Sequence, residues 1–305
     1  MHQQSKTRAA QLSIASNMTL IVLKLGTGIA MHSVSVISEA VHSGIDLIAA
    51  LIAYFSIRES GKPADEIHRF GHGKIESLAA TIEALLILAA AIFIIVEGVK
   101  KLVSGHIEVE QLGAGAAVMA FSALANFFVS RHLLKVARHT DSPALEGDAV
   151  HLRTDVYTSA GVLLGLVAIK LTGLRILDPI VAIGVAFLII KTSFELAGNA
   201  MNHLLDARLP DDEEKVLHEV MRSFSDRCLG YHKLRTRKSG HVRQIDLHLV
   251  VPEGITVAAG HALSHEVIGE IRKRLVNSEV LVHIEPCGEN CEECTLECDY
   301  RSTER

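Results

Sequence analysis

The amino-acid sequence predicts an α-helical membrane protein with six transmembrane helices and a C-terminal α+β cytoplasmic domain. Two observations predict this fold class. The chain of 305 residues is 49% hydrophobic, although 21% of its residues are charged. The charges are unevenly distributed, because long apolar stretches recur up to about residue 205, whereas Leu209–Arg305 is charged and mixed. The first part therefore resembles a bundle of membrane spans, and the second part a water-soluble domain.

Six apolar stretches approach the ~20 residues that an α-helix needs to cross a bilayer. The clearest is Leu112–Ser130, which contains no charged residue, whereas the others include ionisable groups. We predict spans near residues 9–31, 33–57, 77–99, 111–130, 146–171 and 177–200. An even number of spans puts both termini on the same side of the membrane.

Basic residues in the loops indicate which side that is. One side carries Lys6, Arg8, Arg58, Lys62, Arg69, Lys74, Arg131, Lys135 and Arg138, and the other only Lys100, Lys101 and Arg175. Because cytoplasmic loops carry an excess of Lys and Arg, both termini and the soluble domain are predicted to be cytoplasmic. The net charge of −5 and the lack of a strongly basic stripe argue against nucleic acid as a partner.

The soluble part alternates helix and strand patterns. Apolar residues at helical spacing predict helices, and strict alternation of apolar and polar residues predicts strands. The expected order is helix Asp211–Phe224, strands Tyr231–Lys238 and Val242–Val251, helix Val257–Leu275 and strand Val280–Glu285. This order favours a small α+β sandwich with its helices on one side of a sheet.

Two His-x-x-x-Asp pairs lie inside the predicted spans: His42 with Asp46, and His151 with Asp155. Residues four apart share one face of a helix, so two such helices could direct two imidazoles and two carboxylates at one ion. Zn²⁺ favours such a set, and four protein ligands leave no open position for a catalytic water, so carriage is expected and not enzymatic chemistry. The alternative is that these groups only bond neighbouring helices, but ionisable residues within spans usually have a function because burying them is costly.

A loop between the second and third spans contains Asp65, His68 and His72, spaced three and four apart. These residues could converge on one metal ion if the loop makes a helical turn. Gly71 and Gly73 flank His72 and loosen any helix there. A solvated polar loop with incidental histidines is the alternative.

Further candidate ligands lie in the soluble part. His232, His248, His283 and Glu285 could converge on the open face of the sheet, with His261 approaching from the helix, and could hold one or two Zn²⁺ ions. Chance placement is the alternative, since the chain has 17 histidines. Beyond the last strand, Cys287, Cys291, Cys294 and Cys298 could enclose a soft metal ion, or belong to a disordered acidic tail.

The combination of motifs resembles the cation diffusion facilitator family of divalent-metal exporters, in its bacterial zinc and ferrous-iron efflux branch. The resemblance rests on His-x-x-x-Asp in the second and fifth spans and on the loop Asp-x-x-His-x-Phe-Gly-His-Gly-Lys-x-Glu, which starts at Asp65. It implies a homodimer in the bacterial cytoplasmic (inner) membrane that exchanges metal for protons. It also implies that Lys74 and Asp206 link the two domains, and that a quartet with His42 prefers zinc. The family often has Asp at the position of Glu285, which puts the geometry of that ligand in question.

We therefore expect a proton-coupled antiporter that exports divalent cations, with Zn²⁺ as substrate and as a structural or regulatory ion. A broader exporter of Cd²⁺, Fe²⁺, Mn²⁺ and Co²⁺ is one alternative, and a membrane-anchored metal sensor is another. The sensor would not need the ionisable quartet in its spans. The expected domains are a six-span transport domain over 1–207, a cytoplasmic metal-binding domain over 208–286 and a Cys-rich acidic tail over 287–305. Membrane lipid is the remaining expected partner.

Overall fold

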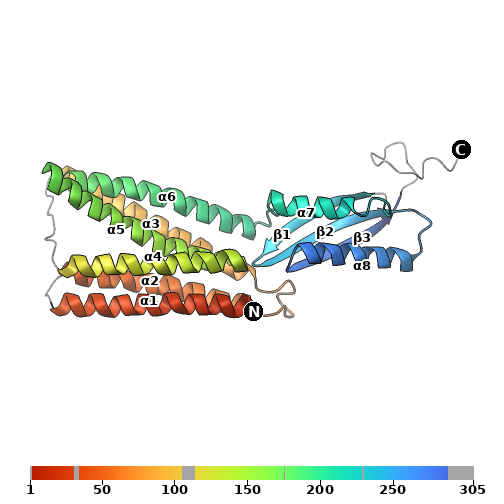
Figure 1. Ribbon diagram of the computed structural model, residues 1–305, viewed down its shortest axis with the longest axis horizontal. Coiled ribbons are helices and arrows are strands. Elements are labelled where there is room, and N and C mark those ends of the chain that lie inside the picture. Colours follow the sequence, from red (N-terminus) through yellow and green to blue (C-terminus); the bar gives the residue numbers. More distant parts are fainter. Residues whose placement is uncertain (1, 31–33, 105–113, 175, 229, 288–305) are drawn as a thin grey trace. The chain divides into compact units, whose positions relative to one another are not determined.

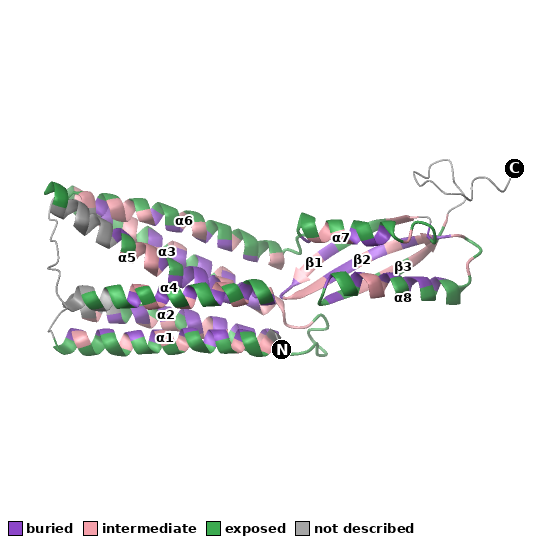
Figure 2. Cartoon of the chain, viewed as in Figure 1, coloured by how far each residue is buried: buried purple, intermediate pink, exposed green. Residues whose placement is uncertain are grey.

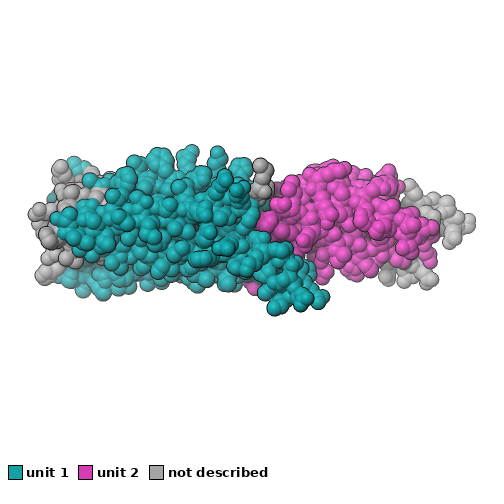
Figure 3. All heavy atoms as spheres, turned by 90° about the horizontal axis from the view of Figure 1, so that it is seen from below, with its two compact units in different colours: residues 1–204 teal, residues 205–305 magenta. Residues whose placement is uncertain are grey.

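The computed structural model of the chain describes residues 2–30, 34–104, 114–174, 176–228 and 230–287. Contacts between residues divide the chain into two compact units, Met1–Leu204 and Leu205–Arg305, which are coloured separately in Figure 3. The first unit is helical and the second combines helices with a sheet.

Six long helices form the first unit (Figure 1). They are α1 His2–Ala30, α2 Val34–Ser60, α3 Lys74–Ser104, α4 Ala114–Thr140, α5 Pro143–Thr172 and α6 Leu177–Leu204. Within the described residues, four stretches are long and apolar enough to cross a membrane: Gln3–Ala30, Ala40–Ser60, Lys74–Ser104 and Pro179–Leu204. Each predicted span overlaps one of the six helices. The number of helices that cross a membrane stays a prediction.

The helices extend beyond the predicted spans. α1 begins at His2 and not near residue 9, and α4 continues to Thr140 and not to residue 130. Apolar composition marks only the part of a helix that lipid would surround, whereas the backbone hydrogen bonds of the same helix continue among polar residues. α5 begins at Pro143, where a missing N–H is tolerated, and the Leu145 N–H donates to Ser142 Oγ at 3.5 Å.

Small residues fill the interior of this bundle. One buried cluster joins Ala9 and Ala10 of α1, Ala53 of α2, Ala79 of α3 and Ala149 of α5. Alanines let helix backbones approach closely, which is typical of helix packing in membranes. Large apolar side chains such as Val22, Phe93 and Phe187 are exposed instead. The buried residues of each helix lie mainly on the side that faces its neighbours (Figure 2).

A buried ionic network links the N-terminal part of α1 to three other segments of the bundle. Glu76, in the first turn of α3, accepts hydrogen bonds from Lys6 Nζ at 2.9 Å and from Ser60 Oγ at 2.6 Å. The Ser142 hydroxyl, just before α5, donates to the other carboxylate oxygen. Because Lys6 and Glu76 are almost completely buried, each depends on the other for charge compensation.

The second unit contains a three-stranded sheet and two helices. Its elements are α7 Asp211–Arg222, β1 Gly230–Ser239, β2 Val242–Val251, α8 Val257–Arg274 and β3 Ser278–Pro286. The strand order is β1-β2-β3, with β1 antiparallel and β3 parallel to β2. Ile245, Leu247 and Leu249 of β2 form one core with residues of both α7 and α8. Because these alternate residues share one face of β2, both helices cover that face, as predicted.

Candidate metal centre

The two His-x-x-x-Asp pairs come together between α2 and α5. One ligand atom each from His42, Asp46 and Asp155 lies within 4.8 Å of the other two. His151 joins them through Asp46, since its Nε2 atom lies 3.1 Å from Asp46 Oδ1. The His42 Nε2 atom lies 4.0 Å from the same oxygen. All four predicted ligands therefore lie close together, although Asp46 and His151 are 105 residues apart in the sequence.

Burial and polar neighbours define the electrostatics of this site. Asp46 and His151 are buried and His42 is half-exposed, so the cluster is enclosed on one side only. Asn126 of α4 donates a hydrogen bond from Nδ2 to Asp155 Oδ2 at 3.2 Å. The buried His151 Nδ1 atom has no hydrogen-bond partner within the described residues. Two carboxylates in an apolar bundle favour a bound cation, which would compensate their charge.

The loop cluster also forms, but without the helical turn. Asp65 accepts hydrogen bonds from the backbone N–H groups of Ile67 and His68 through Oδ1, so the turn is made by the carboxylate itself. The Asp65 carboxylate lies 3.4 Å from His68 Nδ1 and 3.3 Å from His72 Nε2. Gly71 has a φ of +77°, which is incompatible with a continuous helix there. The hydrogen bond from the backbone N–H of His68 is the main cause of the lowered pKa of Asp65. It favours the ionised form of the carboxylate, which is the form that can bind a metal ion.

Three histidines form one row across the sheet of the second unit. His232 of β1 is paired with His248 of β2, which is paired in turn with His283 of β3. Glu285 spans the row, with Oε2 at 2.7 Å from His232 Nε2 and Oε1 at 2.5 Å from His248 Nδ1. Ligand atoms of His232, His248 and Glu285 lie within 4.8 Å of one another. These side chains fit a Zn²⁺ ion by their donor chemistry, and the longer side chain of Glu285 does reach the imidazoles.

Hydrogen bonds from His248 and then His232 lower the pKa of Glu285 to about 2. The carboxylate is therefore ionised over the physiological range of pH. His283 lies at the edge of the cluster, since its Nε2 atom is 3.7 Å from Glu285 Oε1. The described part of the chain does not bring His261 into this row, because its ring lies beside His265, 4.4 Å away between centroids.

Other predicted residues have partners of their own. Lys74 Nζ donates to the Leu204 carbonyl at 3.2 Å, and the Asp206 carboxylate accepts from Arg237 Nη1 at 3.1 Å. The predicted link between Lys74 and Asp206 stays a prediction. Of the tail, only Cys287 is described, and its N–H donates to the Val251 carbonyl at 2.9 Å. Cys291, Cys294 and Cys298 lie outside the described residues.

Sequence reasoning missed the polar neighbours of the quartet. Asn126 lies in the span that contains no charge, where a single amide is the signal that could have identified it. Glu83 of α3 and Asp148 of α5 are fully buried, and their carboxylate oxygens have no hydrogen-bond partner within the described chain. The Ser13 hydroxyl lies beside Asp148 without reaching hydrogen-bond geometry. For Glu83 and Asp148, the signal available in the sequence was an acidic residue inside an apolar span.

These features define a class of protein: a helical membrane protein with imidazole and carboxylate clusters suited to divalent metal ions, coupled to a small α+β domain. Comparison with known proteins agrees. Residues 10–205 match the cation efflux transmembrane domain, and residues 209–287 match the cytoplasmic domain of cation efflux proteins. The chain belongs to the cation diffusion facilitator family, and is a cation-efflux transporter that spans the membrane.

Relatives resemble nearly the whole chain. The cation-efflux pump FieF of Yersinia pestis is 34% identical over 284 residues, covering 92% of this chain and 93% of its own. The transporter sll1263 of Synechocystis is 32% identical over 277 residues, covering 91% of this chain and 89% of its own. A solved structure of CzrB in its zinc form is 29% identical, with a TM-score of 0.26, and the match covers 28% of this chain and 96% of the CzrB chain.

Proposed function

We propose that this chain forms a homodimer that exports Zn²⁺ from the bacterial cytoplasm in exchange for protons. The observation that carries the proposal is the convergence of His42, Asp46, His151 and Asp155 from two helices of the membrane unit. Two imidazoles and two carboxylates match the ligand preference of Zn²⁺ and would form a closed shell without a catalytic water. The bacterial relatives support a location in the inner membrane. The excess of basic residues in the loops on one side supports cytoplasmic termini.

Proton exchange follows from the chemistry of the same residues. Imidazoles must be neutral and carboxylates ionised before they bind a metal ion, so protons and Zn²⁺ compete for the quartet. The contact between His151 Nε2 and Asp46 Oδ1 illustrates this competition, because the atoms that would bind the ion hold a hydrogen bond to each other. Metal arriving from the cytoplasm would displace that bond, and protons arriving from the other side would restore it.

A second candidate is export of a broader range of divalent cations. The half-exposed His42 favours it, because this ligand is the least constrained of the four. If the ring withdraws, two carboxylates and one imidazole remain, and this set suits harder ions such as Mn²⁺ and Fe²⁺. His42→Asp should then widen the range of ions transported. An unchanged order of preference in that variant would argue against a selective role for His42.

The other clusters are proposed as regulatory metal sites. Asp65, His68 and His72 would bind an ion at the loop, and His232, His248, His283 and Glu285 would bind Zn²⁺ on the sheet and bridge the dimer. The Lys74 and Asp206 pair would join the six-span domain, 1–207, to the cytoplasmic domain, 208–286. Tail thiols at Cys287, Cys291, Cys294 and Cys298 would capture soft ions without being required for transport.

The decisive experiment is Zn²⁺ uptake into proteoliposomes with an acidic lumen, followed with a lumenal zinc dye and a lumenal pH dye. We expect Zn²⁺ to enter as the lumen becomes more alkaline, and uptake to stop when the pH difference is collapsed. Glu195→Ala, an exposed carboxylate of α6, is the control and should transport normally. Zinc flux that is indifferent to the pH difference, with no proton movement in return, would refute proton exchange.

A further inference from the structure

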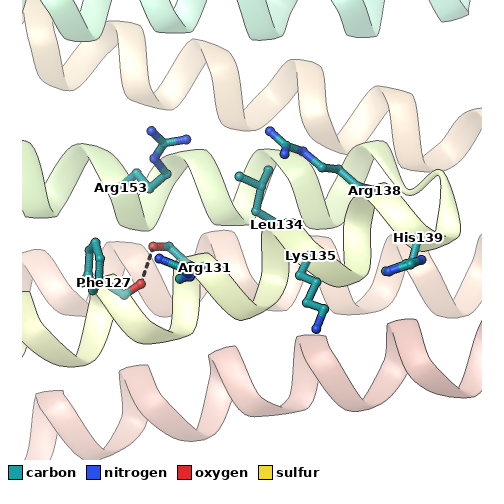
Figure 4. A pocket seen from close by; sticks show the side chains of 8 residues that line it. Phe127, Arg131, Leu134, Lys135, Arg138, His139 and Arg153 are labelled. Carbon is teal, nitrogen blue, oxygen red and sulfur yellow. Dashed lines mark hydrogen bonds between the residues drawn. The ribbon is translucent and has the colours of Figure 1, made fainter.

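A groove with a basic lining runs along α4 and α5 (Figure 4), with a volume of about 500 Å³. Its cationic side chains are Arg131, Lys135 and Arg138 of α4 and Arg153 of α5. The three residues of α4 are spaced four and three apart, so they share one face of that helix. Nothing in the proposed transport mechanism uses these residues.

These cations have few counter-charges in the chain. The Glu146 carboxylate interacts electrostatically with Arg138 at longer range. Within the described residues, however, none of the four lining cations forms an ion pair with a carboxylate. The Arg153 guanidinium donates to Tyr157 Oη at 2.7 Å and lies 5.7 Å from the centre of that ring. Four positive charges around one groove repel one another, so an anionic ligand would stabilise the arrangement.

The preference of cytoplasmic loops for basic residues explains only part of the groove. It accounts for Arg131, Lys135 and Arg138, which follow the predicted span that ends at residue 130. It does not account for Arg153, which is exposed on α5 between His151 and Asp155, two residues of the candidate transport site. An exposed arginine inside a span is costly unless its long side chain reaches a phosphate or water.

Apolar residues complete the lining and indicate the kind of anion. Leu134 lies between Arg153 and Arg138 along the groove, and Phe127 lies at the end opposite His139 (Figure 4). Further exposed apolar side chains, Leu124 and Phe128, continue this surface along α4. A small hydrophilic anion would leave these apolar groups unused, whereas a phospholipid has both a phosphate and an acyl chain.

We propose that this groove is a binding site for an anionic phospholipid. The phosphate lies among Arg131, Lys135, Arg138 and Arg153, and an acyl chain follows Phe127 and Leu134. Basic pockets between transmembrane helices on the cytoplasmic side bind anionic headgroups by this combination of charge and apolar contact. The proposal needs only that α4 and α5 lie in the membrane, and it does not depend on which metal is carried.

The test is native mass spectrometry of the full-length protein in detergent, titrated with phosphatidylglycerol or, in parallel, with phosphatidylcholine. We expect the wild type to retain phosphatidylglycerol selectively. Each charge removed should weaken retention about fivefold, so R131Q/R138Q should lose about 25-fold. The matched control K100Q/K101Q removes two charges from the end of α3 and should bind as the wild type does.

Two further measurements distinguish the alternatives. Inorganic phosphate in millimolar excess should not displace the lipid, and displacement would show a simple anion site and overturn the proposal. Equal retention of phosphatidylglycerol and phosphatidylcholine by the wild type would also overturn it. So would an equal loss of phosphatidylglycerol binding in R131Q/R138Q and in K100Q/K101Q. If R131Q/R138Q does not remain monodisperse, the single variant R153Q should still bind phosphatidylglycerol about fivefold more weakly. Unchanged binding by R153Q would count against the proposal.

Discussion

The quartet between α2 and α5 and the histidine row on the sheet use the same ligand types in opposite environments. In the quartet, the side chains of Asp46 and His151 are only 5% and 8% exposed, and His42 alone is half-exposed. In the row, those of His232 and Glu285 are 49% and 26% exposed. A buried ligand needs another ligand, an ion or a proton to compensate its charge, whereas water screens an exposed one. Single changes should therefore have large effects in the quartet and graded effects on the sheet.

The sharpest test of this contrast compares one ligand from each region. Asp155→Ala should reduce Zn²⁺ uptake into proteoliposomes at least ~100-fold, because the site loses one of its two carboxylates and a neutral water cannot supply that negative charge. His232→Ala should keep the maximal rate within a few-fold and change only its dependence on zinc concentration. Substantial transport by Asp155→Ala in correctly inserted protein would remove the quartet from the mechanism.

A second test compares buried and exposed charge pairs on the same helix, α3. Glu76→Gln leaves the Lys6 ammonium buried without a countercharge and should lower the free energy of unfolding by about 3–5 kcal/mol. Glu97→Gln removes an exposed pair with Lys100 and should leave the unfolding midpoint unchanged. Unfolding of both variants by a denaturing detergent, followed by circular dichroism, measures the difference. Equal midpoints would mean that the buried network does not hold the helices together.

A smaller effect is expected from the neighbour of a ligand than from the ligand itself. Asn126→Ala removes the hydrogen bond that orients Asp155 and should weaken Zn²⁺ binding at the quartet about 10-fold. Asn17, whose side chain donates at 3.4 Å to the backbone carbonyl of Asp46, provides a comparison, because Asn17→Ala leaves the ligand oxygens untouched. Zinc titrations of both variants measure the affinities, in protein that ends at Pro286 and carries Asp65→Asn and Glu285→Gln to disable the loop and sheet clusters. Similar affinities in the two variants would contradict an orienting role for Asn126.

Local patterns predicted the elements, and several of the side chains that lie close together, for physical reasons. Four-residue spacing fixes which side chains share a helix face, so the spacing alone was enough to assign His42 and Asp46 to one site. Alternation along a strand likewise put His248 opposite the apolar row of Ile245, Leu247 and Leu249. Both rules depend on residues close in sequence, which is why they succeed.

Contacts between distant residues were not predictable in this way. Asn126 and Asp155 are 29 residues apart, and Lys6 and Glu76 are 70 apart, so no periodicity connects them. The loop residues come together through a turn made by the Asp65 carboxylate, whereas the sequence suggested convergence only if the loop made a helical turn. His261 was expected to approach the sheet row from its helix. That helix covers the apolar face, and His261 is exposed beside His265.

The smallest expected effect comes from an exposed pair in the second unit, where Arg227 donates two hydrogen bonds to Glu266. These bonds lower the pKa of Glu266 below its ordinary value of 4.5. A carboxylate with a lowered folded-state pKa contributes stability above its unfolded pKa and loses it as pH falls. Hydrogen exchange at residues 223–228, corrected for intrinsic rates, should therefore rise less than about fivefold as pH falls below 4.5. Glu266→Gln should remove this pH dependence of exchange, and the control Glu253→Gln, at an exposed residue, should keep it. If the pH dependence survives in Glu266→Gln, another group causes the acid sensitivity.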